Sequence, residues 1–511
     1  MKNGRSIFVA AIAFLCVQGC VVGPDYHTPA TTMPGSFSSS APTSDTAGAA
    51  DVTRWWKSLN DSELNRLVDR AVQSNFDLQM AVMRLQQARE QEFAVAGFAW
   101  PEIEAAGGAG RGSGTNSVKG RIPGPLNAGT NTTGLTEITY VGGADGAWDV
   151  DLFGGLTREL EAARYDRQAA AEARNDVLIT LISDVANAYV DDRGAQLRLA
   201  IAGADMQAEQ QSYDLVDARY TRGFTNELDP ALAQRQLRIV QAQVAPLRAA
   251  IQQDQRHLAV LLGRLPDDLN AELSTPAALP NLPPRIEPGL PIDLLRRRPD
   301  IRRAERQLAA ATARIGVATD ALYPHVILTA GAGLQGQGLG RLPNASSFDG
   351  SIGPEAYWPL LDFGTLDALV NVQDYHTREL LLNYQQTVLT AVQEVDDAIS
   401  NYQAQQDRVQ SLAGALAAAQ RAVSVASQRY DRGFTNFLDV LDSQRELYAL
   451  QDEYAAAQED VLLQYIALYK ALGGGWEHNQ TTPPARQPQP AVLAAVRRIA
   501  VHDDFENPTQ K

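Results

Sequence analysis

One stretch of this sequence occurs twice. Residues 219–229 and residues 429–439 both read Arg-Tyr-x-Arg-Gly-Phe-Thr-Asn-x-Leu-Asp. A glycine at the same place in both copies indicates a turn that needs a permissive backbone. Because long helical patterns precede and follow each copy, each is predicted to be the tip of a helical hairpin. A duplicated tip implies a duplicated chain.

The duplication extends over most of residues 64–473. At an offset of 210 residues, Trp148 aligns with Trp358, and the second half of each repeat follows without a gap. At an offset of 223 residues, Pro101 aligns with Pro324. The difference between the offsets places a longer loop in the first repeat, before Trp148. The sequence therefore predicts two tandem repeats, which is not the pattern of an ordinary enzyme.

The composition and the remaining motifs argue against nucleic-acid binding and catalysis. The formal net charge is −16, so nucleic acid is not an expected partner. The segment 331–336 fits G-x-G-x-x-G, but no helix follows it to hold a pyrophosphate. The arginine-rich run 296–303 is interpreted as a solvated helix start with Asp300 as its N-cap. Because the histidines lack metal-ligand spacing and no catalytic set stands out, we expect no enzyme activity, metal or cofactor.

The N-terminus has the pattern of an export signal. Lys2 and Arg5 precede an apolar run at 7–17, which is too short to span a bilayer. Residues 17–20, Val-Gln-Gly-Cys, resemble a bacterial lipoprotein cleavage box, which implies a covalent lipid on Cys20. The alternative is a signal peptide that is cleaved without lipidation. Residues 23–50 are rich in Pro, Ser, Thr, Ala and Gly and are predicted to form an extended tether.

Two strand patterns occur in each repeat. In the first repeat, one pattern begins at residue 102 and the other spans residues 136–152. Their counterparts in the second repeat are at about 323–338 and 346–361. Four strands cannot close a barrel, for which about eight are needed. Unpaired strand edges inside a membrane cost several kcal/mol per group. If the strands span a membrane, two, three or four identical chains must therefore pool them.

Residues 156–220 form a predicted arm with a coiled-coil-like seam. Small and medium apolar residues recur at steps of three and four, and only Asp192 and Glu209 interrupt them. The second repeat keeps this pattern up to Tyr430. An arm of roughly 65 residues is about 95–100 Å long. This length exceeds any bilayer and suits a tunnel across the periplasm.

Several motifs, in order, resemble one family. They are GPDYHTP at 23–29, the stretch 55–89 that begins WWKSL, and LLRRRPDIRRAERQLAAA at 294–311. From about residue 20 to 476 the chain resembles TolC-type outer-membrane efflux factors of the lipoprotein (NodT/OprM-like) branch. The resemblance implies a mostly α-helical fold with a transmembrane β-barrel. Three chains would form an α-barrel and a 12-stranded β-barrel, with four strands per chain.

The same resemblance implies a function and partners. The protein would be the outer-membrane exit duct of a tripartite RND-type efflux system that exports small molecules such as drugs. Its expected partners are two further copies of itself, a periplasmic adaptor, an inner-membrane RND transporter and outer-membrane lipids. The predicted divisions are a signal peptide (1–19), a lipidated tether (20–50), repeat 1 (51–263), an equatorial segment (264–292), repeat 2 (293–476) and a mobile tail (477–511).

The resemblance also places a periplasmic gate at the hairpin tips. Position by position, the gate residues are Tyr430, Asp439 and Asp442 in the second tip and Asp229 in the first. Three chains would bring about six to nine carboxylates into a ring that attracts cations. For Asp229 an alternative remains, because Asp followed by Pro230 is also the pattern of a helix N-cap.

A second role of the tips, by resemblance, is docking to the adaptor. It falls on Arg222 and Gly223 in the first tip and on Arg432 and Gly433 in the second. The alternative is a simple tight turn, but the identity continues through Phe-Thr-Asn, which a turn alone does not require. Two rival functions stay open at this point: a duct for protein secretion, and a non-conducting coiled-coil lipoprotein of the envelope.

Overall fold

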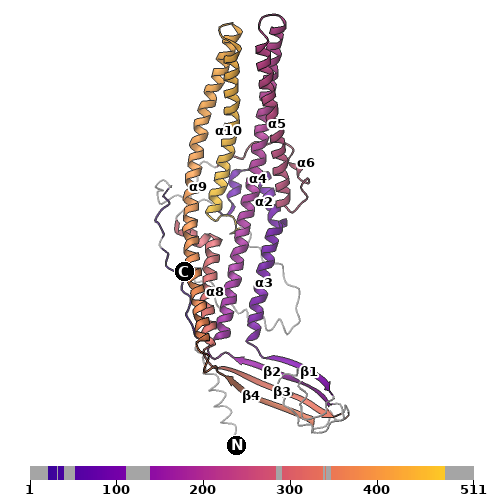
Figure 1. Ribbon diagram of the computed structural model, residues 1–511, viewed down its shortest axis with the longest axis vertical. Coiled ribbons are helices and arrows are strands. Elements are labelled where there is room, and N and C mark those ends of the chain that lie inside the picture. Colours follow the sequence, from indigo (N-terminus) through magenta and orange to yellow (C-terminus); the bar gives the residue numbers. More distant parts are fainter. Residues whose placement is uncertain are drawn as a thin grey trace.

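The computed structural model describes residues 21–31, 33–38, 52–110, 139–282, 291–337, 340 and 347–477. Within this part, long helices run side by side along one axis, and a sheet projects from one end of them (Figure 1). The predicted signal peptide, Cys20, residues 32 and 39–50 of the predicted tether and nearly all of the predicted tail lie outside these residues.

The two repeats have matching helical arms. In repeat 1 the arm is α4 (Gly155–Thr221), which returns as α5 (Leu228–Leu261). In repeat 2 it is α9 (Thr365–Asp431), which returns as α10 (Phe437–Ala471). Both outgoing arms have 67 residues, in agreement with the predicted arm of about 65. None of the helices in the described ranges is both long and apolar enough to cross a membrane.

The four predicted strands form one antiparallel sheet. They are β1 (Glu102–Gly110), β2 (Thr139–Val150), β3 (His325–Gln337) and β4 (Phe348–Tyr357), in the order β1-β2-β3-β4. The pairing of β2 with β3 joins the two repeats, with Gly143 opposite Gly333. Within this sheet β1 and β4 each pair on one side only, so both present open edges.

Shorter helices complete the bundle. The 3-10 helix η1 (Val52–Leu59), α2 (Ser62–Ser74) and α3 (Phe76–Phe98) precede the sheet. Between the repeats lie α6 (Asn270–Leu273) and α7 (Pro291–Arg297), followed by α8 (Pro299–Asp320). Asp61 caps α2, because its carboxylate accepts hydrogen bonds from the Glu63 and Leu64 N–H groups at 2.9 and 3.0 Å.

The main core lies where the N-terminal helices meet the C-terminal end of α10 and the middle of α4. Trp55 and Trp56 of η1 are each 1% exposed. The Trp55 ring stacks on Tyr469 at 5.7 Å between centroids and meets Tyr465 edge-on at 6.1 Å. The Trp-Trp pair of the sequence motif therefore fastens the N-terminal segment to the last helix of repeat 2.

The structure corrects the prediction made for the arginine-rich run 296–303. Asp300 is not the N-cap, because α8 begins at Pro299 and its N-cap is Arg298. Nor is the run simply solvated. Arg298 is 8% exposed and donates to Asp300 at 2.6 Å and to the Ala471 carbonyl at 2.9 Å. It also pairs with Glu394 at 2.7 Å. The segment joins α8 to α9 and α10 through these bonds.

We expect Arg298→Ala to destabilise the bundle. The change leaves Asp300 without its guanidinium partner, and breaking a buried pair in this way costs about 3 kcal/mol. The matched control is Arg303→Ala, because Arg303 pairs with Asp176 at 3.0 Å while both side chains are more than a third exposed. That loss should stay below about 1 kcal/mol. Thermal unfolding of the purified variants measures the difference, and equal shifts would contradict the role given to Arg298.

Candidate functional site

The two hairpin tips have the same backbone geometry. Beyond α4, Gly223 has φ +76°, and beyond α9, Gly433 has φ +75°. The Gly223 N–H donates to the Tyr220 carbonyl at 2.9 Å, and the Gly433 N–H donates to the Tyr430 carbonyl at 3.0 Å. A Cβ at either glycine would meet no atom within 4 Å. The left-handed conformation, and not a lack of space, therefore requires glycine here.

The residues after each glycine start the returning helix. In the first tip the Thr225 hydroxyl donates to the Asp229 carboxylate, and in the second the Thr435 hydroxyl donates to Asp439. Asn226 accepts from the Leu228 N–H at 3.0 Å. In the second tip Asn436 accepts from the Asp439 N–H at 3.1 Å. The repeated Thr-Asn-x-Leu-Asp thus has a structural reason, since it supplies bonds to the free groups of a helix start.

This geometry corrects the cap alternative for Asp229. Helix α5 begins at Leu228, so Asp229 and Pro230 lie inside its first turn, and the N-cap position belongs to Glu227. Asn226 takes the side-chain capping role that the Asp-Pro pattern assigned to Asp229. Asp229 is half-buried and bound to Thr225, whereas Asp439 is exposed.

The duplicated phenylalanine is highly exposed in both tips. Phe224 is 78% exposed and Phe434 is 72% exposed. Arg222 and Arg432 are exposed beside them. Each tip therefore presents an exposed phenylalanine ring and an exposed guanidinium, in addition to the glycine that shapes the turn. Such a surface suits contact with another protein, because exposed aromatic and arginine side chains are enriched in interfaces.

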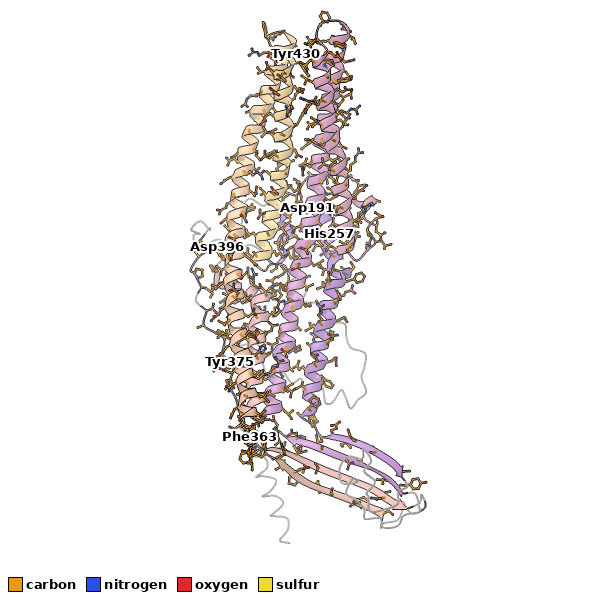
Figure 2. The ribbon with its side chains drawn as sticks, viewed as in Figure 1. Asp191, His257, Phe363, Tyr375, Asp396 and Tyr430 are labelled. Atoms are coloured by element: carbon orange, nitrogen blue, oxygen red, sulfur yellow. The ribbon has the colours of Figure 1, made fainter. Side chains whose placement is uncertain are left out.

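A small apolar cluster joins the two tips, and the sequence analysis missed it. Its buried members come from α4, α5 and α10: Val216, Ala233, Phe437, Val440 and Leu441. Tyr430 packs against this cluster, with its ring 5.6 Å from that of Phe437. Arg219 of α4 lies over the Tyr430 ring at 4.6 Å, and Figure 2 shows Tyr430 near the ends of the hairpins. Tyr430 thus connects one hairpin to the other.

A signal for this cluster was present in the sequence. Within the duplicated stretch, one of the positions that differ is Glu227 in the first copy and Phe437 in the second. An apolar residue among the polar residues of a helix start indicates that the second tip packs against another apolar surface. The last predicted gate residue, Asp442, does not join the cluster, because its side chain is 64% exposed and lies 3.8 Å from Arg445.

The first described residues are fastened where the sheet meets the helices. The Val22 N–H donates to the Phe153 carbonyl at 2.9 Å. Arg158, at the start of α4, donates to the Val22 carbonyl at 3.1 Å and to Asp25 at 2.7 Å. Cys20 itself lies outside the described residues, but the chain that follows it is held at this junction.

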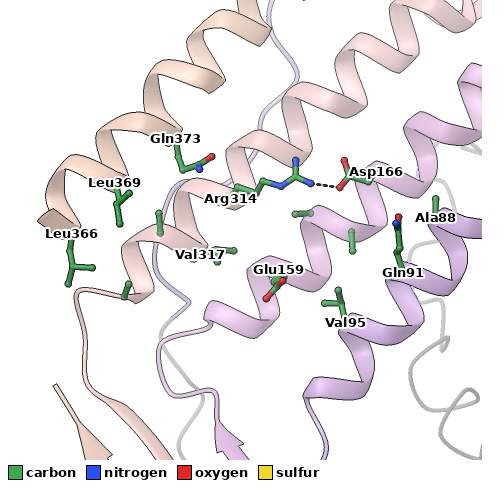
Figure 3. Close-up of a pocket in the computed structure, with 14 residues that line it drawn as sticks. Ala88, Gln91, Val95, Glu159, Asp166, Arg314, Val317, Leu366, Leu369 and Gln373 are labelled. Carbon is green, nitrogen blue, oxygen red and sulfur yellow. Dashed lines mark hydrogen bonds and ion pairs between the residues drawn. The ribbon is translucent and has the colours of Figure 1, made fainter. Parts of the chain in front are cut away.

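A pocket of about 490 Å³ lies between α3, α4, α8 and α9, near the sheet (Figure 3). Arg314 of α8 and Asp166 of α4 form an ion pair beside it. Gln91 and Glu159 add polar groups, and Leu369 of α9 adds an apolar one. None of the predicted gate or docking residues lines this pocket.

Comparisons with known proteins agree on one family. A family model described as outer membrane efflux protein matches residues 67–264 and 290–474. Nodulation protein T of Rhizobium leguminosarum bv. viciae is 30% identical over 475 residues, which are 93% of this chain and 95% of that protein. The solvent efflux pump outer membrane protein SrpC of Pseudomonas putida is 32% identical over 479 residues, covering 92% and 98%. The solved structure of the outer-membrane channel OprN has a TM-score of 0.81 at 34% identity, and the match covers 90% of this chain and all of that one.

Proposed function

The chain belongs to the outer membrane efflux protein family, and we propose that it works as a homotrimer whose periplasmic mouth opens when its helical hairpins separate. It is an outer-membrane channel that serves a tripartite RND-type efflux pump as the exit duct for small molecules, with its helical tunnel in the periplasm. Members of the family are transport ducts, and we expect no catalytic activity or cofactor in this chain.

One observation supports the proposed homotrimer most directly: the sheet of a single chain is not closed. The sheet has open edges at β1 and β4, and four strands are too few to close a barrel. Three chains provide twelve strands, the number that the family resemblance implies. In a closed ring every β1 edge meets a β4 edge of the next chain, which removes unpaired groups from the membrane.

The helices support the same arrangement. On α3, Met80 and Met83 are 48% and 57% exposed, and on α9, Val372 and Tyr375 are 58% and 67% exposed. The two helices lie on opposite sides of the bundle (Figure 1). Apolar stripes on opposite sides are what a head-to-tail ring of identical chains requires, because each chain offers one stripe to each neighbour.

A charge on either stripe should break the trimer. We expect Met83→Asp and Val372→Asp each to yield monomers in detergent, because each buries a carboxylate against an apolar face in every contact. Combining both changes should add little, since both remove the same contact. Light scattering and heat-modifiable electrophoresis measure the oligomer. A trimer that survives both changes would contradict the arrangement.

For the gate we propose Tyr430, Asp439, Asp442 and Asp229. Tyr430 supports the proposal by bridging the two hairpins, so its release is part of any separation of the tips. Asp439 and Asp442 are exposed and lie nearly one turn apart on α10. Three chains would bring these carboxylates together, and Asp229 would add to them from the first tip.

For docking we propose the tips themselves, with Arg222, Gly223, Arg432 and Gly433 as the adaptor-contacting residues of the earlier prediction. The periplasmic adaptor and the inner-membrane RND transporter are the proposed partners. The exposed rings of Phe224 and Phe434 now extend this surface. Since Thr225 and Asn226 are explained by the helix start, the phenylalanines are the repeated residues best suited to a partner.

We also propose that Cys20 carries a covalent lipid. The hydrogen bond from Val22 to Phe153 supports this proposal, because it would place a lipid on Cys20 close to the end of the sheet. The cargo that we propose is small toxic molecules such as drugs. Relatives differ in what their names record, since one is a solvent efflux protein and another is a nodulation protein.

A deletion strain tests the function. Loss of the chain should lower tolerance to toxic small molecules, and the wild-type chain should restore it. A strain that keeps its tolerance but no longer releases a secreted protein would favour a secretion duct instead. Purely helical monomers in the membrane fraction would favour a structural lipoprotein.

A further inference from the structure

Two carboxyl groups are buried where the hairpins meet, between the tips and the main core. Asp205 is 7% exposed and Glu209 is 0% exposed. They lie one turn apart on α4 and interact with Tyr448 and Asp452 of α10. Glu209 precedes the end of α4 at Thr221 by 12 residues, or about 18 Å. The pair therefore lies between the two hairpins and outside the proposed gate.

The charges at this position do not balance. Asp452 takes both hydrogen bonds of Arg198, at 2.7 and 2.9 Å. Both Glu209 oxygens are buried, and neither forms a hydrogen bond of normal geometry, although the Tyr448 hydroxyl faces them. Three carboxyl groups thus share one guanidinium, which is already paired. Ionising Asp205 and Glu209 here would bury two uncompensated charges, so the neutral forms are favoured.

A buried carboxylate elsewhere on the same helix shows the contrast. Asp192 is also 0% exposed, but it accepts hydrogen bonds from Gln196 at 2.8 Å and from Gln255 at 3.0 Å. Burial raises its pKa to about 6, although these hydrogen bonds oppose the shift. Burial, together with Glu209 and Asp452, raises the pKa of Asp205 to about 7. Burial also raises the pKa of Glu209.

The fold itself does not require these carboxyl groups. At the repeat offset of 210, Asp205 and Glu209 correspond to Ala415 and Ala419. The equivalent arm α9 is continuous through these alanines and has the same length. The two acids are therefore specific to repeat 1, at the place where α4 meets the other hairpin.

We infer that this junction is a proton-linked contact: the hairpins stay together while Asp205 and Glu209 carry protons, and separating them releases those protons to water. The inference rests on the proposed opening by hairpin separation and adds a chemical ligand, the proton, to it. Tyr448, Asp452 and Arg198 are the titratable and charged groups that surround the pair.

The direction with pH follows from the two states. In the joined state the pKa of Asp205 is about 7, and in the hydrated, separated state it returns to its ordinary value near 4. Below that ordinary value the contact has its full strength, and it weakens as the pH rises towards 7. Each proton that a chain releases changes the ratio of separated to joined hairpins by up to about tenfold per pH unit across its window.

Spin labels on the two hairpins measure this ratio directly. Leu215 of α4 is 51% exposed and Leu438 of α10 is 47% exposed, so both positions accept a label through cysteine substitution. The full mature protein is diluted with unlabelled chains, and distances are recorded from about pH 5 to 8. The parent chain without these substitutions checks for labelling elsewhere. This readout follows the hairpins whether or not the protein transports anything.

We expect the wild type to shift to longer distances as the pH rises, and Asp205→Asn/Glu209→Gln to stay joined throughout. The variant Asp205→Ala/Glu209→Ala, copied from repeat 2, should also lose the pH dependence. The matched control is Asp254→Asn/Glu459→Gln. Burial raises the pKa of both groups to about 7, but they lie near the main core and should leave the wild-type shift intact. A wild type that does not respond, or an amide variant that still does, overturns the inference.

Discussion

Asp439→Ala together with Asp442→Ala should give larger or more frequent openings in planar-bilayer recordings, with a weaker preference for cations than the wild type. The reason is the carboxylate ring that three chains would form at the mouth. Each hydrogen bond or ion pair lost at an exposed site is worth roughly 0.5–1 kcal/mol. Three chains act together, so the open fraction should rise by about ten- to a hundredfold.

The structure supplies a control that separates two explanations. Asp439 accepts a hydrogen bond from Thr435, so its loss removes both a charge from the mouth and a bond at the start of α10. Thr435→Val removes the donor and keeps the charge. If Thr435→Val behaves like the wild type, the charge of Asp439 matters for conduction. If it behaves like Asp439→Ala, the effect is local, and if the double alanine variant conducts like the wild type, the gate residues are wrong.

Phe224→Asp together with Phe434→Asp should abolish export while leaving a folded trimer in the membrane. The two rings are among the most exposed large apolar side chains of the molecule, at 78% and 72%. Burying a phenylalanine in an interface contributes about 1.5–3 kcal/mol, and each chain offers two. Replacing both with charged groups should weaken adaptor binding by more than about a hundredfold.

The measurement is the affinity of the purified adaptor for the variant, beside drug tolerance in a complemented deletion strain. Leu265→Asp is the matched control, because Leu265 is 73% exposed but lies beyond the far end of α5. The control should retain binding and tolerance. Full export by the double variant would place the docking surface elsewhere.

The sequence predicted the architecture well because the repeat and its periodicity are local signals. The 3-4 pattern gave the arms and the strand alternation gave the four strands, and a glycine shared by both tips gave the turns. These features depend on neighbours along the chain. The need for several chains followed from the free-energy cost of unpaired strand edges. The family resemblance then gave three as the number of chains.

What the sequence did not predict depends on partners far away in the chain. Arg298 reads as a solvated residue until Ala471 and Glu394 are placed beside it. In the sequence, Glu209 only interrupts the apolar seam, and its burial becomes evident when α10 is placed over it. The cap alternative for Asp229 failed for a different reason, since the helix begins two residues earlier than the Asp-Pro pattern indicates.

Because α4 and α9 have the same length, at 67 residues each, the two arms together set how far the protein reaches across the periplasm. Removing seven residues from one arm and a matching seven from its returning helix would leave that tip about 10 Å short of the other. A partner that meets both tips at one height would then reach only half of them. Re-engineering this protein for a wider or narrower envelope therefore requires the same change in four helices at once.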